Sequence, residues 1–192
     1  MKYIIKVPEK YETRKKEVLE FFGKNPPEKI LEKFTGRVFQ GDIVIEHKEL
    51  GYGADFQNDE VQTDFEREAF YIFLCTVHEL AHILLKQDTP WFEYGDAGKI
   101  ISEYKNYQYE QYKYDFQYAI EQTIVFMIQS ACENEAGLRP VKYDRWQETF
   151  ESNGVKALSL VIWPEFLNYL ENIKKYKMID EWILEVLKKY FY

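Results

Sequence analysis

The feature that most constrains the fold is a long helical pattern over residues 63–86 that is apolar on a wide face. Apolar side chains recur there at helical spacing, which predicts a helix buried along most of its length. Its centre nevertheless reads His78-Glu79-Leu80-Ala81-His82. Two of the chain's three histidines are therefore expected on an otherwise apolar helix, where burying them is costly without a compensating partner such as a metal ion.

The spacing of these polar residues predicts a zinc site. His78 and His82 stand at positions i and i+4, so their side chains project from one helix face a single turn apart. Two imidazole nitrogens at that spacing can each reach one zinc ion at about 2.0–2.1 Å. Glu79 follows the first histidine and is placed to take a proton from the attacking water and return it to the leaving amine. The competing interpretation, two hydrogen-bonded histidines and a solvated glutamate, leaves the burial cost without compensation.

The stretch from His78 to His82 resembles the active-site helix of the zincin metallopeptidases, the His-Glu-x-x-His zinc enzymes. The resemblance covers this helix and extends to the helix that follows. It implies an α+β, mostly helical fold with a small sheet before the active-site helix and a helical C-terminal half. It also implies an edge strand between Arg37 and His47 that pairs with an extended substrate, and a zinc-dependent peptidase activity with Glu79 as the general base.

The third protein ligand expected of a catalytic zinc is assigned to Glu121. In the glutamate-type zincins, which this chain resembles, that ligand comes from a second helix downstream. Glu121 lies near the start of an apolar helical pattern at about residues 117–135, where a buried carboxylate needs a metal or a cation. An exposed first-turn residue is the other interpretation of Glu121.

Other candidates for the third ligand stay open. Asp88 falls six residues after His82, where metzincin-like enzymes place theirs, but Leu85 replaces the glycine of their turn and favours a continuing helix. Asp96 has no defined geometry. Glu133, at the polar end of the second helix, is expected to be solvated or to cap the helix.

Three further kinds of residue near the His78–His82 motif also have expected roles. Cys75, one turn before His78, is expected to be a small buried core residue rather than a thiolate ligand. His47 is expected at the surface, and the alternative is that it polarises a substrate carbonyl. One of several tyrosines in a polar segment is expected to stabilise the oxyanion or to cover the groove. These are Tyr104, Tyr107, Tyr109, Tyr112, Tyr114 and Tyr118.

The remaining sequence predicts short elements around the two long helices. Strands are expected at residues 2–7, 37–40 and 42–46, and helices at about 11–22 and 28–34, with Gly23 and the Pro26-Pro27 pair ending the first of them. Three more helical stretches are expected after about residues 147, 164 and 177. No repeat or linker divides the chain, so residues 1–192 are expected to form one domain: mixed at 1–60, the active-site helices at 61–137, and a helical part at 138–192.

Composition narrows the partners and the location. A net charge of -8 argues against a nucleic-acid partner, because phosphate binding needs a basic face. No apolar run reaches the roughly 18 residues of a membrane span, and the first residues do not have the pattern of a signal peptide. Cys75 and Cys132 lie in apolar helical contexts and are expected to be reduced, which is typical of the cytoplasm.

The sequence therefore predicts a zinc-dependent hydrolase, most simply a peptidase acting on a peptide or protein. Two other functions stay open. One is a zincin-like binding or scaffolding module in which zinc is structural or absent, favoured by the high aromatic content and by the several candidates for the third ligand. The other is a hydrolase with a substrate other than a peptide, because activated water is not selective. The sequence contains no indication of the substrate or the oligomeric state.

Overall fold

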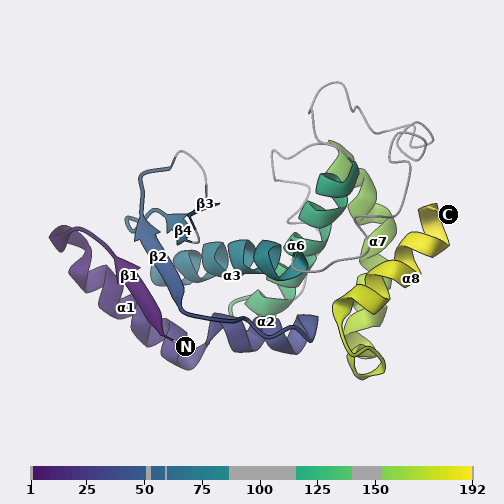
Figure 1. Cartoon of the computed structure of the whole chain (residues 1–192), viewed down its shortest axis with the longest axis horizontal. Helices are drawn as coiled ribbons and strands as arrows, with labels where there is room; N and C mark the ends of the chain where they lie inside the picture. The colour runs from purple at the N-terminus through teal and green to yellow at the C-terminus, as the bar shows by residue number, and fades with distance from the viewer. Residues whose placement is uncertain (1, 51–52, 59, 87–115, 140–152, 192) are drawn as a thin grey trace.

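The computed structural model describes residues 2–50, 53–58, 60–86, 116–139 and 153–191, and Figure 1 shows their arrangement. Four strands and several helices alternate in the first half of the chain, and helices alone make up the described part of the second half. In chain order the elements are β1 (Tyr3–Lys6), η1 (Glu9–Tyr11), α1 (Glu12–Lys24), α2 (Pro27–Thr35), β2 (Ile43–His47), β3 (Ala54–Gln57), β4 (Glu60–Thr63), α3 (Ala69–Lys86), α6 (Phe116–Glu135), α7 (Asn153–Glu171), η4 (Ile173–Lys175) and α8 (Ile179–Phe191).

The strands form one mixed sheet in the order β1-β2-β4-β3. β1, β2 and β4 are parallel, and β3 joins β4 in the antiparallel sense. Ile45 in the middle of β2 lies opposite Ile5 of β1 and Val61 of β4, and all three side chains are buried. Because side chains alternate between the faces of a strand, this row marks the inner face of the sheet.

Helices α1 and α3 pack together against the inner side of the sheet. Phe73 of α3 contacts the rings of Phe21 and Phe22 from α1, and Phe22 also contacts Tyr3 of β1. The buried face of α3 continues through Ile72, Val77, Leu80 and Leu84 at helical spacing. The motif helix is therefore held on one side by the sheet and α1.

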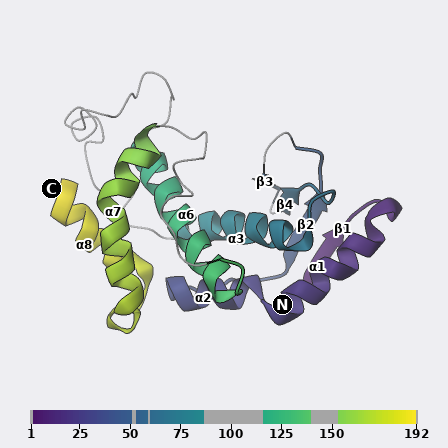
Figure 2. The same cartoon turned by 180° about the vertical axis from the view of Figure 1, so that it is seen from behind.

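Helix α6 crosses the C-terminal half of α3, and α2 packs against both helices (Figure 1, and from behind in Figure 2). The contact is made by apolar residues that α6 carries almost all round, among them Ile124, Val125, Ile128 and Cys132. Polar side chains of α6 that face α3 are consequently taken out of water. This crossing brings residues of α6 to the histidines of α3.

The C-terminal helices α7 and α8 form a hairpin that is tied to α2. The hydroxyl of Tyr169 donates a hydrogen bond to the carbonyl of Phe34 at 2.8 Å. Arg37 makes a two-pronged ion pair with Asp180, through its Nε at 2.9 Å and its Nη2 at 2.8 Å. Gly36, with φ of +69°, ends α2 where a Cβ atom would come within 2.2 Å of the carbonyl oxygen of Lys177.

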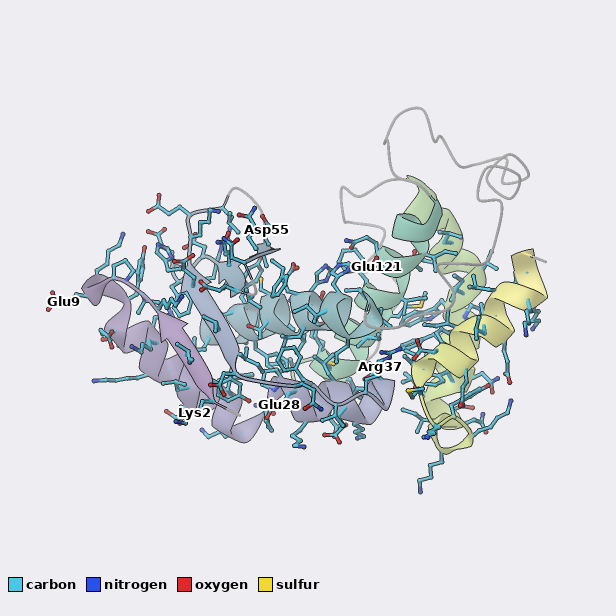
Figure 3. The ribbon with its side chains drawn as sticks, in the orientation of Figure 1. Lys2, Glu9, Glu28, Arg37, Asp55 and Glu121 are labelled. Carbon is cyan, nitrogen blue, oxygen red and sulfur yellow. The ribbon has the colours of Figure 1, made fainter. Side chains whose placement is uncertain are left out.

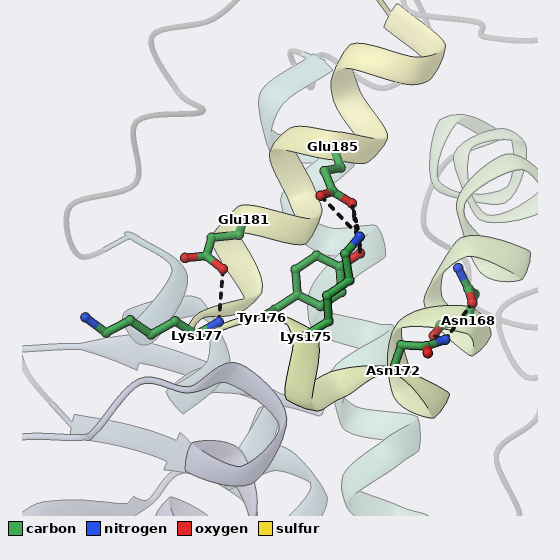
Figure 4. Close-up of polar contacts among 7 residues, drawn as sticks. All are labelled: Asn168, Asn172, Lys175, Tyr176, Lys177, Glu181 and Glu185. Carbon is green, nitrogen blue, oxygen red and sulfur yellow. Dashed lines mark hydrogen bonds and ion pairs between the residues drawn. The ribbon is translucent and has the colours of Figure 1, made fainter.

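The turn between α7 and α8 is held by side-chain contacts of its own (Figure 4). Glu185 of α8 accepts hydrogen bonds from the hydroxyl of Tyr176 at 2.8 Å and from the ammonium group of Lys175 at 3.2 Å. One turn earlier, Glu181 accepts the backbone N–H of Lys177 at 2.9 Å. These bonds stabilise the hairpin that packs against α2.

The α+β, mostly helical class predicted from the sequence is confirmed, with the small sheet before α3 and helices in the described part of the C-terminal half. The strand predicted at residues 37–40 is wrong: these residues form an irregular connection between α2 and β2. Arg37, at its start, is held by the ion pair with Asp180 of α8 rather than by a neighbouring strand. The strand β2 is also not an edge strand: it lies between β1 and β4, whereas β3 lies at one end of the described sheet.

Other boundaries differ from the prediction for physical reasons. The helix predicted from residue 63 begins only at Ala69, because β4 ends at Thr63 and a turn separates it from α3. α1 continues through Gly23 and ends just before Pro26-Pro27. The helices predicted after 147 and after 164 are one helix where described, because α7 runs through Pro164; the start of the first lies outside the described residues. None of the helices in the described residues is both long enough and apolar enough to span a membrane.

Candidate metal centre

His78 and His82 turn toward each other on the face of α3 that meets α6. Their Nε2 atoms lie 3.3 Å apart, and the centroids of the rings are 5.0 Å apart. The i, i+4 spacing alone places both rings on one face, but the approach of these particular nitrogens depends on how each ring is rotated. The ring rotations are set by contacts with α6.

Each histidine is held at its other nitrogen by a polar side chain of α6. Nδ1 of His82 lies 2.5 Å from Oε1 of Glu121, and Nδ1 of His78 lies 2.9 Å from Oε1 of Gln129. Figure 3 shows Glu121 where α6 passes the end of α3. A carboxylate only accepts hydrogen bonds, and so does an amide oxygen, so both histidines carry their proton on Nδ1. The Nε2 atoms of the two rings then face each other.

The burial of His78 shows which charge state its ring has. Loss of solvent around the ring, together with the neighbouring His82, lowers the pKa of His78 from 6.5 to about 3. The ring is therefore neutral at physiological pH, which is the form that binds a metal. The ring of Phe126 packs against it in a T-shaped arrangement, with ring centroids 4.8 Å apart.

The separation of the two nitrogens fits a zinc ion. Two ligands of one tetrahedral zinc, each at about 2.0–2.1 Å from the ion, lie about 3.3–3.4 Å apart. The Nε2 atoms of His78 and His82 are 3.3 Å apart. The donor pair is thus suited to a metal in its chemistry and in its spacing.

Within the described residues, no third metal-binding side chain is grouped with His78 and His82. No group of three or more His, Cys, Asp or Glu side chains in that part of the chain is arranged to hold a metal. Glu121 is buried beside the site, 2% exposed, but contacts the Nδ1 atom of His82 rather than the pair of Nε2 atoms. Besides His78, Gln122 meets Nε2 of His82, through its own Nε2 at 3.1 Å.

Of the other candidate ligands, only Glu133 lies within the described residues. Glu133 is 2% exposed and accepts a hydrogen bond from Gln129, so the expectation that it is solvated is wrong: the crossing of α6 over α3 and α2 removes it from water. Asp88 and Asp96 lie outside the described residues. So do the candidate tyrosines, except Tyr118, which belongs to α6 but whose side chain is not among those described.

Glu79 is buried in α3 and is 9% exposed. It lies one turn after Cys75, whose thiol donates a hydrogen bond to the carbonyl of Gly53 at 3.2 Å. Burial, together with smaller effects that include the charge of Glu79, raises the pKa of Cys75 to about 11, so this thiol is neutral. Cys75 is therefore the buried residue that the sequence predicts, on the α3 face beside the segment entering β3. Cys132 is likewise buried and free.

His47 is not at the surface, which corrects the sequence prediction. Its side chain is 8% exposed, its ring lies 4.3 Å from that of Tyr11, and its Nδ1 accepts the backbone N–H of Phe65 at 3.1 Å. His47 is the last residue of β2, and the chain that leaves the neighbouring strand β4 encloses its ring. The ring has a structural role there.

Sequence reasoning overlooked Gln122 and Gln129 as parts of this site. A signal was present: polar residues 122, 129 and 133 recur at intervals of seven and four on a helix that is rich in apolar residues. Intervals of seven and four place side chains on one helix face. Buried amides on such a face need specific partners, and here the partners are histidines and a glutamate.

Comparison with protein families, with curated proteins and with solved structures finds no match to this chain. The resemblance to the zincins therefore stays a prediction from the motif.

Proposed function

We propose that this protein is a zinc-dependent hydrolase that cleaves a peptide or amide bond. The observation that carries the proposal is the pair of Nε2 atoms, 3.3 Å apart on His78 and His82, with each ring held by a hydrogen bond at Nδ1. Such outer hydrogen bonds are the usual way in which proteins orient metal-binding histidines. The two imidazoles are the proposed ligands.

The roles of the residues follow from their positions. Zinc, when bound, polarises a carbonyl group and lowers the pKa of water toward about 7. Glu79, buried on α3 next to the first histidine, accepts the proton of the attacking water and returns it to the leaving amine. Glu121 is the proposed third ligand, and for this its carboxylate has to exchange the hydrogen bond to His82 for the metal.

The strand β3 supplies a place for an extended substrate. It lies at one end of the described sheet and packs against α3. Cys75 connects the segment leading into β3 to the α3 face that carries Glu79, through its bond to Gly53. A peptide added along the outer edge of β3 by backbone hydrogen bonds would run past that face of α3. Two free, buried cysteines suit a reducing compartment, so we propose the cytoplasm as the location.

Metal analysis tests the proposal directly. Protein purified without chelators should contain one zinc per chain, and His78→Ala and His82→Ala should each lose it. His47→Gln is the matched control, because it removes the third histidine and keeps an acceptor for the N–H of Phe65. Absence of zinc from the wild-type protein after incubation with the metal would overturn the proposal.

The arrangement around Glu121 favours one other function. The described residues contribute no third His, Cys, Asp or Glu donor beside the two histidines, and Glu121 is bonded to His82. Both observations suit a zincin-like binding module without catalysis. A folded protein that binds no zinc and hydrolyses no peptide from a broad library would support that module.

A further inference from the structure

The ring of His78 is contacted along one stripe of α6. Phe126 packs against the ring, Gln129 meets its Nδ1, and Glu133 lies one turn further along the helix. The residues stand three and four positions apart, so they share one face of α6. His78 therefore receives its orientation from a helix that is separate in sequence from its own.

The direction of the Gln129 amide is set by Glu133. An amide group has a donor end and an acceptor end of nearly the same shape, so its neighbours determine which end faces which side. Nε2 of Gln129 lies 3.2 Å from Oε1 of Glu133, whose carboxylate only accepts hydrogen bonds. The donor end of the amide therefore faces Glu133, and the oxygen faces His78.

The amide oxygen in turn selects the form of the imidazole. Because Oε1 of Gln129 accepts at 2.9 Å, the proton of the neutral ring is kept on Nδ1 of His78. The lone pair then lies on Nε2, the nitrogen 3.3 Å from Nε2 of His82. Reversal of the amide would put a donor against Nδ1, shift the ring proton to Nε2 and block that nitrogen.

We propose that Gln129 and Glu133 are positioning residues that hold His78 ready to bind a metal: Glu133 orients the amide of Gln129, and Gln129 fixes the tautomer and the ring of His78. This inference rests on the proposed function, because its purpose is to present Nε2 to zinc. The two histidines are thus held in different ways. The carboxylate of Glu121 contacts His82 directly, whereas His78 contacts the neutral amide of Gln129, which is itself bonded to Glu133.

The test measures the tautomer of His78 in the metal-free protein. Long-range correlation spectra of ¹⁵N-labelled imidazole rings distinguish a proton on Nδ1 from one on Nε2, and three histidines make the assignment simple. We expect Nδ1–H for His78 in the wild type. Gln129→Leu removes the acceptor, and Glu133→Gln replaces a pure acceptor with a group that can also donate. Both variants should show a mixture of the two tautomers.

Zinc affinity is the second measurement. We expect Gln129→Leu and Glu133→Gln to weaken zinc binding by about 10–100-fold, the usual effect of losing an outer hydrogen bond. Glu135→Gln is the matched control: it removes the same charge two residues away on α6, where the side chain is exposed and paired with Lys33. It should change neither the tautomer nor the affinity. Circular dichroism establishes that each variant is folded.

The outcomes separate this inference from the proposed function. Nε2–H on His78 in the wild type, or an unchanged tautomer in both folded variants, overturns the positioning role even if zinc binds. A tautomer that responds in both variants, with zinc affinity falling while Glu135→Gln stays at the wild-type value, supports it. A tautomer that responds in a protein that binds no zinc supports the orienting contact and overturns the zinc function.

Discussion

The carboxylate of Glu121 lies 2.5 Å from Nδ1 of His82, at the ring nitrogen that does not face His78. A buried carboxylate at this position holds the imidazole proton on Nδ1 and increases the basicity of Nε2. The same carboxylate is the proposed third ligand of the metal. These two roles predict different responses to substitution.

We expect Glu121→Ala to abolish stoichiometric zinc binding and Glu121→Gln to weaken it by about 10–100-fold, because the amide oxygen still accepts the Nδ1–H bond but brings no negative charge. Competition with a chromogenic chelator measures both affinities. Near-wild-type affinity in Glu121→Gln, with a roughly tenfold loss in Glu121→Ala, would assign Glu121 to the orientation of His82 alone.

Glu79→Gln should retain zinc and lose hydrolysis. The amide cannot take the proton of the attacking water, and a general base contributes about 100- to 10,000-fold to a rate. Peptide hydrolysis by the wild type and the variant, at equal zinc content, measures the effect. Activity of the variant within threefold of the wild type would remove Glu79 from the mechanism.

Asp180→Ala should lower the free energy of unfolding by about 3 kcal/mol, because it leaves the largely buried Arg37 without the Asp180 carboxylate. Urea unfolding, with Arg37→Met and the double variant, gives the coupling energy of the pair. The exposed pair Lys189–Glu165 provides the comparison, and Lys189→Ala should cost less than about 1 kcal/mol. Similar losses in both pairs would contradict a special role for burial.

Gly36→Ala should destabilise the fold more than Gly137→Ala, although both glycines have φ of +69°. A Cβ atom at Gly137 meets nothing within 4 Å, so this substitution costs only the left-handed strain, about 1–2 kcal/mol. At Gly36 the Cβ atom would lie 2.2 Å from the carbonyl oxygen of Lys177, and overpacking raises the total to about 2–5 kcal/mol. Thermal unfolding of the two variants compares them, and equal melting temperatures would refute the close approach.

Stability should fall in alkali because of Cys75. Its pKa is raised from 9.0 to about 11 in the folded protein, mainly by burial, so above pH 9 the unfolded chain loses the thiol proton first. The folded state then binds more protons than the unfolded state, and stability decreases between pH 9 and pH 11 by about 2–3 kcal/mol. Urea unfolding at pH 8 and pH 11 should show a smaller decrease for Cys75→Ala, and an identical decrease would contradict this contribution.

Local patterns in the sequence were sufficient to predict much of the fold. Apolar spacing located α6, and short runs of β-branched apolar residues located β1 and β2. The same spacing placed His78 and His82 on one face of α3, because residues four apart on a helix are neighbours whatever surrounds them. Each of these features depends on residues close together in the chain.

Only the tertiary structure decided the order of the strands and the partners of the histidines. β2 became an interior strand because β4, later in the sequence, pairs beside it. Gln129 reaches His78 across 51 positions, and Glu121 reaches His82 across 39, because α6 crosses α3 at the level of the motif. The sequence by itself determined that two imidazoles share a helix face. The crossing of two helices determined which nitrogen of each imidazole faces the other, since that depends on hydrogen bonds from a distant part of the chain.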